Sequence, residues 1–437
     1  MPRSQAEIQL VFAASDGKIY PFPGFEGVGM KAGQYSRLDP KYLVPLPEHA
    51  EFFLLKDRTA VGYDAESDEY AELSIDPYSD SKAPVYPVAA FLPPGLSLTH
   101  STAYAEKEVS KLLPLFAYAP CVFYHGKFYS SAVPVDEDIR HDERFMDAAA
   151  IRKNIGEYGK LFPKNRLVPH LGGCATVNAC ANAKNFFLGR FEVPIPTSPV
   201  CNAQCQGCIS FQPPEHGIPS SQKRITFTPF PEEIAEIALF HMDREPDPIV
   251  SFGQGCEGEP TLAGAVIEKA IRLIRASSSK GSININTNAS RPEVIARLFD
   301  AGLNSMRVST NSVREPYYSR YYQPKGYAFR EVTASIGAAK KRGGFVSLNY
   351  LSMPGFTDSK EESAELTTYV GGHGIDMIQW RNLNYDPRQY FRDMGISGDV
   401  ECMGMPETFA RLKKAHPRLN MGYFNPKKEL VETAKKT

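Results

Sequence analysis

The spacing of apolar residues along the chain differs before and after residue 190. Before it, short runs rich in β-branched and aromatic residues, at 8–12, 52–55, 86–91 and 121–129, alternate with Pro, Gly and Asp turns. His-Gly at 125–126 stands between strand-like flanks, which predicts a hairpin. We expect a β-rich accessory domain over residues 1–160.

After residue 190, strand-like and helix-like segments alternate. Strands are predicted at 191–194, 249–253, 282–286, 305–309, 344–351 and 376–380, and helices at 231–241, 262–276, 291–301, 329–342 and 359–370. Such repeated units imply a parallel sheet with right-handed crossovers, closed or nearly closed. The predicted fold class is α/β, a partial (β/α)6 TIM-like barrel with a β-rich N-terminal accessory domain.

These patterns divide the chain into four parts. The accessory domain is followed by a connecting segment, 161–188, that carries Cys174 and Cys180. The core barrel takes 189–395, and a C-terminal extension, 396–437, contains one predicted helix at 406–416. A chain of 437 residues is long enough for this arrangement.

Composition is that of an ordinary globular protein. Apolar residues make up 42% and the formal net charge is −1, so charge does not indicate nucleic acid or membrane as a general partner. The first residues lack a signal-peptide pattern, and no apolar run has the length of a membrane span. We expect a cytoplasmic protein, in which eight cysteines favour metal or thiol chemistry over disulfides.

Cys201, Cys205 and Cys208 place three thiols in one short loop directly after the first predicted strand of the barrel. Closed iron–sulfur clusters take four thiolates, and structural zinc sites take four ligands. A compact triple therefore suggests a cluster with one iron left open for another ligand.

Polar residues follow the other strands, where such barrels build their sites. Each alone could be a helix cap or an ordinary turn, but their coincidence at successive strand ends favours a pocket for a small polar cofactor. They are the glycine-rich turn 253–260, Asn-Thr-Asn at 286–288, Ser-Thr-Asn at 309–311, Asn349, and Gln-Trp-Arg-Asn at 379–382.

Residues 189–395 resemble the radical S-adenosylmethionine (radical SAM) superfamily. The resemblance rests on Cys-x3-Cys-x2-Cys after the first strand and Gly-Glu-Pro after the second. It implies that Cys201, Cys205 and Cys208 hold a [4Fe–4S] cluster whose fourth iron binds S-adenosylmethionine. It also implies cofactor contacts from Gly258, Glu259, Asn288, Ser309 and Asn311.

Two positions depart from the superfamily's pattern. Gly207 stands where an aromatic residue is usual, so the adenine contact is expected from elsewhere, such as Ile209 or Phe211. Glu257 replaces the first glycine of the usual Gly-Gly-Glu. Neither change touches the cluster ligands.

The resemblance implies a radical enzyme. Reductive cleavage of S-adenosylmethionine at the cluster gives a 5′-deoxyadenosyl radical, which abstracts hydrogen from a substrate that the sequence does not identify. A low-potential electron donor of the flavodoxin or ferredoxin type is the implied partner. Two alternatives stay open: an iron–sulfur electron-transfer or sensing protein on the same fold, and a radical SAM enzyme that modifies RNA or a protein docked by the N-terminal domain.

The catalytic residues are not identified by pattern, but two candidates stand out. Arg381, at a strand end, suits a carboxylate or phosphate, with a salt bridge as the alternative. Cys256, inside the glycine-rich turn, is expected to face the cofactor region and is interpreted as a small packing residue, with a hydrogen donor or covalent handle as the alternative. Cys174 and Cys180 are read as buried thiols, with a second cluster, joined by Cys121 or Cys402, as the alternative.

Overall fold

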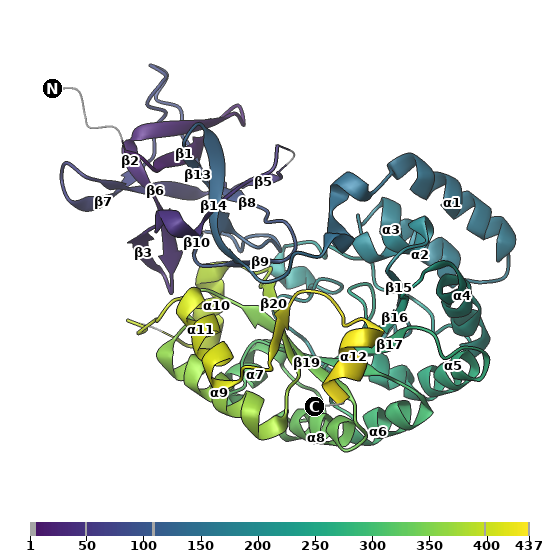
Figure 1. Ribbon diagram of the computed structural model, residues 1–437. Coiled ribbons are helices and arrows are strands. Elements are labelled where there is room, and N and C mark those ends of the chain that lie inside the picture. The colour runs from purple at the N-terminus through teal and green to yellow at the C-terminus, as the bar shows by residue number, and fades with distance from the viewer. Residues whose placement is uncertain (1–5, 49, 107–109, 397–398, 436–437) are drawn as a thin grey trace.

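The computed structural model describes residues 6–48, 50–106, 110–396 and 399–435. Figure 1 shows the N-terminal sheet beside one end of an arc of helices, and this arc encloses the parallel sheet. A group of three helices lies at the other end of the arc, between the two sheets in the sequence.

The N-terminal part forms the predicted β-rich unit. Its central strand order is β11-β6-β2-β1-β13-β14-β4, all antiparallel. His125 (φ 45°) and Gly126 (φ 78°) both have positive φ between β13 and β14, as a type I′ hairpin turn requires, so the predicted hairpin is confirmed. The strands are β1 (Gln9–Ala13), β2 (Ile19–Lys31), β3 (Gln34–Arg37), β4 (Leu43–Pro45), β5 (Phe52–Leu54), β6 (Arg58–Asp64), β7 (Glu69–Leu73), β8 (Tyr86–Ala90), β9 (Leu96–Leu98), β10 (Ser101–Thr102), β11 (Tyr104–Glu106), β12 (Ala119–Pro120), β13 (Val122–Tyr124) and β14 (Lys127–Pro134).

The second sheet confirms the predicted α/β class with a partial barrel. Its seven parallel strands follow the sequence order from β15 to β21, and the two outer strands are not paired with each other among the described residues. The barrel is therefore open, and a short seventh strand extends the six that the sequence predicts. The strands are β15 (Glu192–Ile195), β16 (Ile249–Phe252), β17 (Ser282–Thr287), β18 (Ser305–Thr310), β19 (Phe345–Ser352), β20 (Met377–Asn382) and β21 (Asn420–Gly422).

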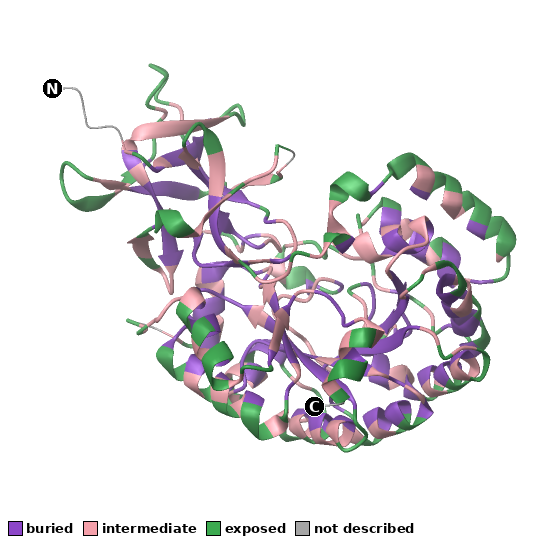
Figure 2. Ribbon diagram, in the orientation of Figure 1, coloured by how far each residue is buried: buried purple, intermediate pink, exposed green. Residues whose placement is uncertain are grey.

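Helices cover the outer face of this sheet, and Figure 2 shows their buried residues turned toward the strands. In α5, Ile267, Ile271 and Ile274 recur at helical spacing and are fully buried. Burial of each of these side chains stabilises the folded state by roughly 1.5–3 kcal/mol. No helix in the described part of the chain is long and apolar enough to cross a membrane. The helices are α4 (Pro231–Arg244), α5 (Gly264–Ser277), α6 (Pro292–Ala301), α7 (Glu315–Tyr322), α8 (Phe329–Lys340), α9 (Lys360–His373), α10 (Pro387–Met394), α11 (Met405–Ala415) and α12 (Lys428–Lys435).

Three helices connect the two sheets: α1 (Ala148–Leu161), α2 (Leu167–Thr176) and α3 (Ala181–Leu188). Asp147 caps α1 by accepting from the backbone N–H groups of residues 149 and 150. The ring of Tyr158 packs against Phe240 of α4 at 5.0 Å, which fixes the group to the edge of the barrel. Because α1 begins at Ala148 and the last N-terminal strand ends at Pro134, the helical part starts before residue 161.

The N-terminal unit is fastened over the carboxyl ends of the barrel strands. Asn382, which ends β20, donates to the Leu96 carbonyl (2.8 Å) and accepts from the Leu98 N–H (2.9 Å) of β9. Asp386, the N-cap of α10, accepts from the Tyr104 hydroxyl of β11 at 3.0 Å. These buried polar contacts hold one edge of the β-rich unit against the open mouth of the barrel.

Candidate active site at the carboxyl ends of the parallel strands

A cavity of about 370 Å³ opens where the parallel strands end. All three loop cysteines line it, together with the glycine-rich turn and polar residues from β17 to β20. Its size is within the range of small-molecule sites. Predicted site residues that line it are Cys201, Cys205, Cys208, Gly258, Glu259, Asn288, Ser309 and Arg381.

The cysteine loop is held by the helix after β18. The N–H groups of Gln204 and Gln206 donate to the carbonyls of Tyr322 and Tyr321, each at 3.0 Å. The three thiols are half-buried and free of disulfides. Burial raises the pKa of the Cys201 thiol to about 11, so this thiol stays protonated until a metal cation replaces the proton.

The contacts of Glu257 explain why a glutamate stands where the superfamily usually has a glycine. Its buried carboxylate accepts from the Thr197 and Ser198 N–H groups, at 2.7 and 3.0 Å, just before the cysteine loop. The other oxygen accepts from Gly253 and Gln254 N–H at 2.7 and 2.8 Å. Burial raises its pKa to about 7, although these donors favour the ionised form. Glu257 thus ties the turn to the end of β15.

Gly258 lies in backbone contact with the cysteine loop. Its N–H donates to the Ser198 carbonyl at 2.7 Å, and a Cβ at this position would lie 2.0 Å from the Val200 carbonyl oxygen. Only glycine fits so close an approach. The next residue, Glu259, accepts from the Asn288 N–H (2.8 Å) at the end of β17 and from the Thr287 hydroxyl. The turn is therefore braced between two strand ends.

Asn311 does not line the cavity, although Ser309 does. β18 ends at Thr310 and the chain then turns, so the alternation that would place 309 and 311 on one face is lost. The Asn311 amide instead donates to the Tyr390 hydroxyl at 3.0 Å.

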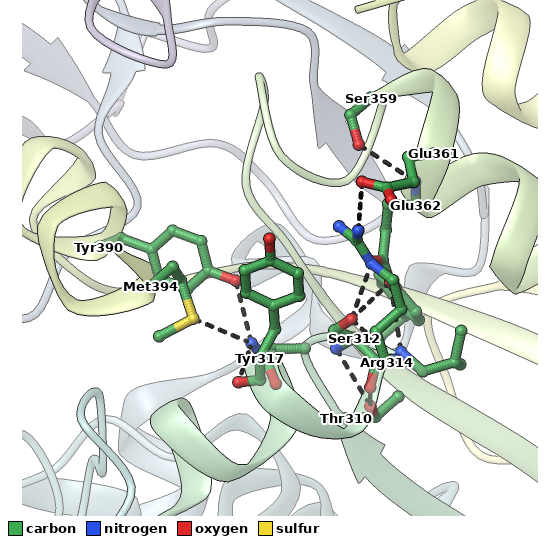
Figure 3. A network of polar contacts seen from close by, with 12 residues as sticks. Thr310, Ser312, Arg314, Tyr317, Ser359, Glu361, Glu362, Tyr390 and Met394 are labelled. Carbon is green, nitrogen blue, oxygen red and sulfur yellow. Dashed lines mark hydrogen bonds and ion pairs between the residues drawn. The ribbon is translucent and has the colours of Figure 1, made fainter. Parts of the chain in front are cut away.

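Figure 3 shows the network around this turn. Buried Glu362 of α9 accepts from the Ser312 hydroxyl (2.8 Å) and from Arg314 Nε (2.7 Å). These contacts fix the segment that leads from β18 into α7.

Two half-buried arginines reach the same cavity. Arg307 of β18 donates to Gln379 (2.9 Å) and Arg381 of β20 donates to the Tyr423 carbonyl (2.6 Å), while the Nε atoms of both are unpartnered among the described residues. Neither arginine has an ion-pair partner in the described ranges. Burial, together with the charge of Arg381, lowers the pKa of Arg307 to about 9. This wall of the cavity carries two positive charges with no carboxylate at ion-pair distance among the described residues, and buried Glu192 acts on Arg307 only from farther away.

Arg307 was missed in the sequence. The available signal was a charged residue in the middle of the apolar strand run at 305–309, and strand alternation does place it on the inner face. Cys256 is misplaced by the sequence expectation. It is the one residue of the turn 253–260 that does not line the cavity, and its thiol lies instead beside Cys174 and His170.

The second departure, Gly207, is explained by an aromatic residue from another element. A Cβ at Gly207 would lie 2.8 Å from the hydroxyl oxygen of Tyr321 in α7. Tyr321 and Ile209 line the cavity, whereas Phe211 is 48% exposed and does not. An aromatic ring from α7 therefore occupies the space next to the third cysteine.

The N-terminal unit completes the cavity with an apolar wall made of Phe91, Leu92, Pro93 and Ala117. An open parallel half-barrel with three free cysteines and a glycine-rich turn at its strand ends defines the class, an iron–sulfur enzyme with a small polar cofactor.

Comparison with known proteins agrees with this class. Residues 195–367 match the family model described as the radical SAM superfamily, so this part of the chain is a radical SAM domain, without an assigned subgroup. It is 32% identical over 156 residues to a probable dual-specificity RNA methyltransferase RlmN of Chlorobium luteolum. That match covers 31% of this chain and 43% of the relative, less than half of the relative's length.

Two solved structures also match parts of the chain, both at low sequence identity. Methylornithine synthase (PylB) has a TM-score of 0.37 and 13% identity, covering 64% of this chain and 76% of that chain. Streptococcus suis SuiB bound to S-adenosylmethionine has a TM-score of 0.34 and 14% identity, covering 71% and 69%.

The cofactors of this enzyme are a [4Fe–4S] cluster and S-adenosylmethionine. The residues fit both. Three free thiols share one cavity wall, and buried polar atoms on the adjoining walls, including Asn349 Oδ1, have no partner within the described part of the chain.

Proposed function

We propose that the protein abstracts hydrogen from a small substrate that carries a carboxylate or phosphate. Arg307 and Arg381 bind this anionic group. The observation that carries the proposal is a pair of arginines in the cavity of the three cysteines. Their Nε atoms are buried and unpartnered, and neither side chain has an ion-pair partner among the described residues. A buried charge is costly unless it is paired, so a ligand anion is the partner these groups lack.

When bound, the cluster and S-adenosylmethionine supply a 5′-deoxyadenosyl radical. Cys201, Cys205 and Cys208 hold the cluster, while the turn at Gly258 and Glu259 and the polar groups of Asn288 and Ser309 bind the cofactor. Asn311 acts as a positioning residue, because it holds α10 through Tyr390.

The substrate is positioned by the two arginines. From their wall of the cavity they orient its anionic group. The apolar wall at Phe91–Pro93 excludes water from the reacting carbon. Radical SAM enzymes need a reductant, and a flavodoxin- or ferredoxin-type donor is the partner we propose for that electron.

RNA is a second candidate substrate. The match with a probable RNA methyltransferase favours it, and the β-rich N-terminal unit beside the cavity would be the docking module. The phosphates of RNA would also satisfy a positive wall.

The test uses anaerobically reconstituted protein, dithionite and S-adenosylmethionine, with 5′-deoxyadenosine as the readout. A cell extract is separated on an anion exchanger into unretained metabolites, retained small metabolites and RNA. We expect the retained small metabolites to stimulate 5′-deoxyadenosine release. Stimulation by RNA alone would favour the second candidate, and stimulation confined to unretained metabolites would contradict an anionic substrate.

Arginine variants assign the effect to the site. Arg307→Met and Arg381→Met should each lower the stimulated rate by at least ~30-fold, since the anion would lose a half-buried, hydrogen-bonded charge partner. Iron content and the unstimulated rate should stay unchanged. Arg342→Met, on the exposed surface, is the matched control.

A further inference from the structure

A second group of metal-ligating side chains lies on the opposite side of the glycine-rich turn. His170 and Cys174 stand one helical turn apart on α2, and Cys256 comes from the turn itself. The ligand atoms of the three residues all lie within 4.8 Å of one another. Residues distant in the sequence thus converge on one point.

The spacing is that of ligands to one ion. Cys174 Sγ lies 3.6 Å from His170 Nε2. With Zn–S at about 2.3 Å and Zn–N at about 2.0–2.1 Å, tetrahedral geometry separates a sulfur and a nitrogen ligand by about 3.6 Å. Thiolates bound to different irons of a cluster stand farther apart, and the loop cysteines do not converge in this way within the described ranges.

Cys180 is the candidate for a fourth ligand, although its thiol is not in the group whose ligand atoms lie within 4.8 Å of one another. Cys180 is the N-cap of α3, and its N–H donates to the Cys174 carbonyl at 2.9 Å. Three cysteines and one histidine are a ligand set of structural zinc sites.

The burial of these cysteines argues against a role as reactive thiols. Cys174 is 2% exposed and Cys256 is 3% exposed, so a substrate has no access to either sulfur. The surroundings are apolar, because both cysteines belong to the main core of the barrel.

We infer that His170, Cys174 and Cys256 bind a single zinc-type metal ion, with Cys180 as the fourth ligand. Metal binding releases the thiol protons and changes no oxidation state. The ion would fasten α2 and α3 to the turn whose other residues line the cavity. A hydrogen bond from Asn182 of α3 to Gln254 (3.3 Å) already links the same two parts.

The test is elemental analysis of the full chain, purified anaerobically and reconstituted with iron and sulfide. We expect about one zinc per chain beside the iron of the cluster. Cys174→Ala should lose the zinc and keep the iron, and Cys201→Ala should lose the iron and keep the zinc. Cys121→Ala, another buried thiol, should change neither.

A milder variant guards against misfolding. His170 is only half-buried, and its replacement by Ala should weaken zinc binding by at least ~10-fold, measured by competition with a chelator. Addition of Co²⁺ to zinc-free protein should give the visible bands of a tetrahedral cobalt–thiolate complex.

Several results would overturn the inference. A folded wild-type protein that binds neither zinc nor cobalt would do so, as would zinc that persists in Cys174→Ala. Additional iron that disappears in Cys174→Ala would show a second cluster instead. A thiol count lowered by two, restored by a reductant, would show a Cys174–Cys256 disulfide. None of these results depends on the substrate or on the arginine pair.

Discussion

The two cysteine groups of this protein differ in how they are built. The loop cysteines 201, 205 and 208 follow one another in the sequence and face a cavity, with their thiols spread along one wall. His170, Cys174 and Cys256 come from a helix and a distant turn, and they meet at one buried point. A spread, accessible triple suits a cluster that must exchange electrons and bind a cofactor. A buried group of converging ligands suits a structural ion that holds segments of the chain together.

The two groups also share an element. The turn 253–260 presents most of its residues to the cavity and Cys256 to the other side. A change in one group can therefore reach the other through this turn. The following predictions separate the two groups and then test the link.

Removal of a loop cysteine should have the largest effect. In Cys205→Ser we expect iron to fall from about four per chain to near zero, and 5′-deoxyadenosine formation to fall at least about 1,000-fold, because the ligands act as one unit. Zinc content should not change. Iron analysis and chromatography of the products measure both effects, and a variant that still cleaves S-adenosylmethionine would refute the ligand assignment.

Removal of the second metal should have an intermediate effect. A zinc chelator added to the reconstituted protein should remove one zinc, leave the iron, and lower the melting temperature by about 4–8 °C if ~2 kcal/mol is lost from a domain of this size. Differential scanning calorimetry measures the shift. Cys174→Ala should show the lower melting temperature without the chelator and no further change with it.

Glu257→Gln should disturb both groups. An amide offers one acceptor oxygen where two carboxylate oxygens now accept from four N–H groups, and each buried donor left without a partner costs about 1–3 kcal/mol. We expect weaker binding of S-adenosylmethionine and weaker zinc retention together. Glu232→Gln, a surface carboxylate on α4, is the matched control. Loss of only one of the two properties would show that the turn does not link them.

The same residue predicts a pH dependence. The pKa of Glu257 is about 7 in the folded protein against 4.5 for a free carboxyl, so the folded state binds more protons between these values. This group's contribution to stability is complete below about pH 4.5 and is lost as the pH rises through 7. Urea unfolding across this range should show the decline in wild type, and Glu257→Gln should lack it.

The smallest expected effect concerns the position before the third cysteine. In Gly207→Ala the new methyl group meets the Tyr321 hydroxyl, and overpacking of this kind costs about 1–3 kcal/mol. We expect S-adenosylmethionine binding, followed by calorimetry, to weaken several-fold. Tyr321→Phe removes the hydroxyl and should restore most of the affinity in the double variant. If it does not, the clash lies elsewhere.

The regular elements of the barrel could be predicted because their signals are local. Runs such as 282–286 and 305–309 carry enough apolar residues to identify strands β17 and β18, and Pro231 marks the start of α4. The strand β21 was missed because Asn420, Met421 and Gly422 have no strand pattern of their own. This strand forms only because β20 is already there to pair with it.

The site was predicted where residues are close in the sequence and missed where the fold brings them together. The cysteine loop and Gly258 are contiguous signals. Asn311 was assigned to the cofactor by the family resemblance, but β18 ends at Thr310 and the turn that follows directs the Asn311 amide to Tyr390. The meeting of Cys256 with Cys174 depends on how α2 packs against the barrel, and nothing in the spacing of either residue indicates it.

Because Phe91, Leu92, Pro93 and Ala117 form one wall of the cavity, two separate units of the chain build the site. The parts that generate a radical are encoded in the barrel, while this face of the reaction chamber is encoded in a separate unit that makes no contribution to the sheet beneath it. Insertions or substitutions around residues 91–93 can reshape what the chamber admits and leave the cysteine loop and the glycine-rich turn intact. In a lineage of such enzymes, new substrates would be acquired by exchanging the cover of the chamber.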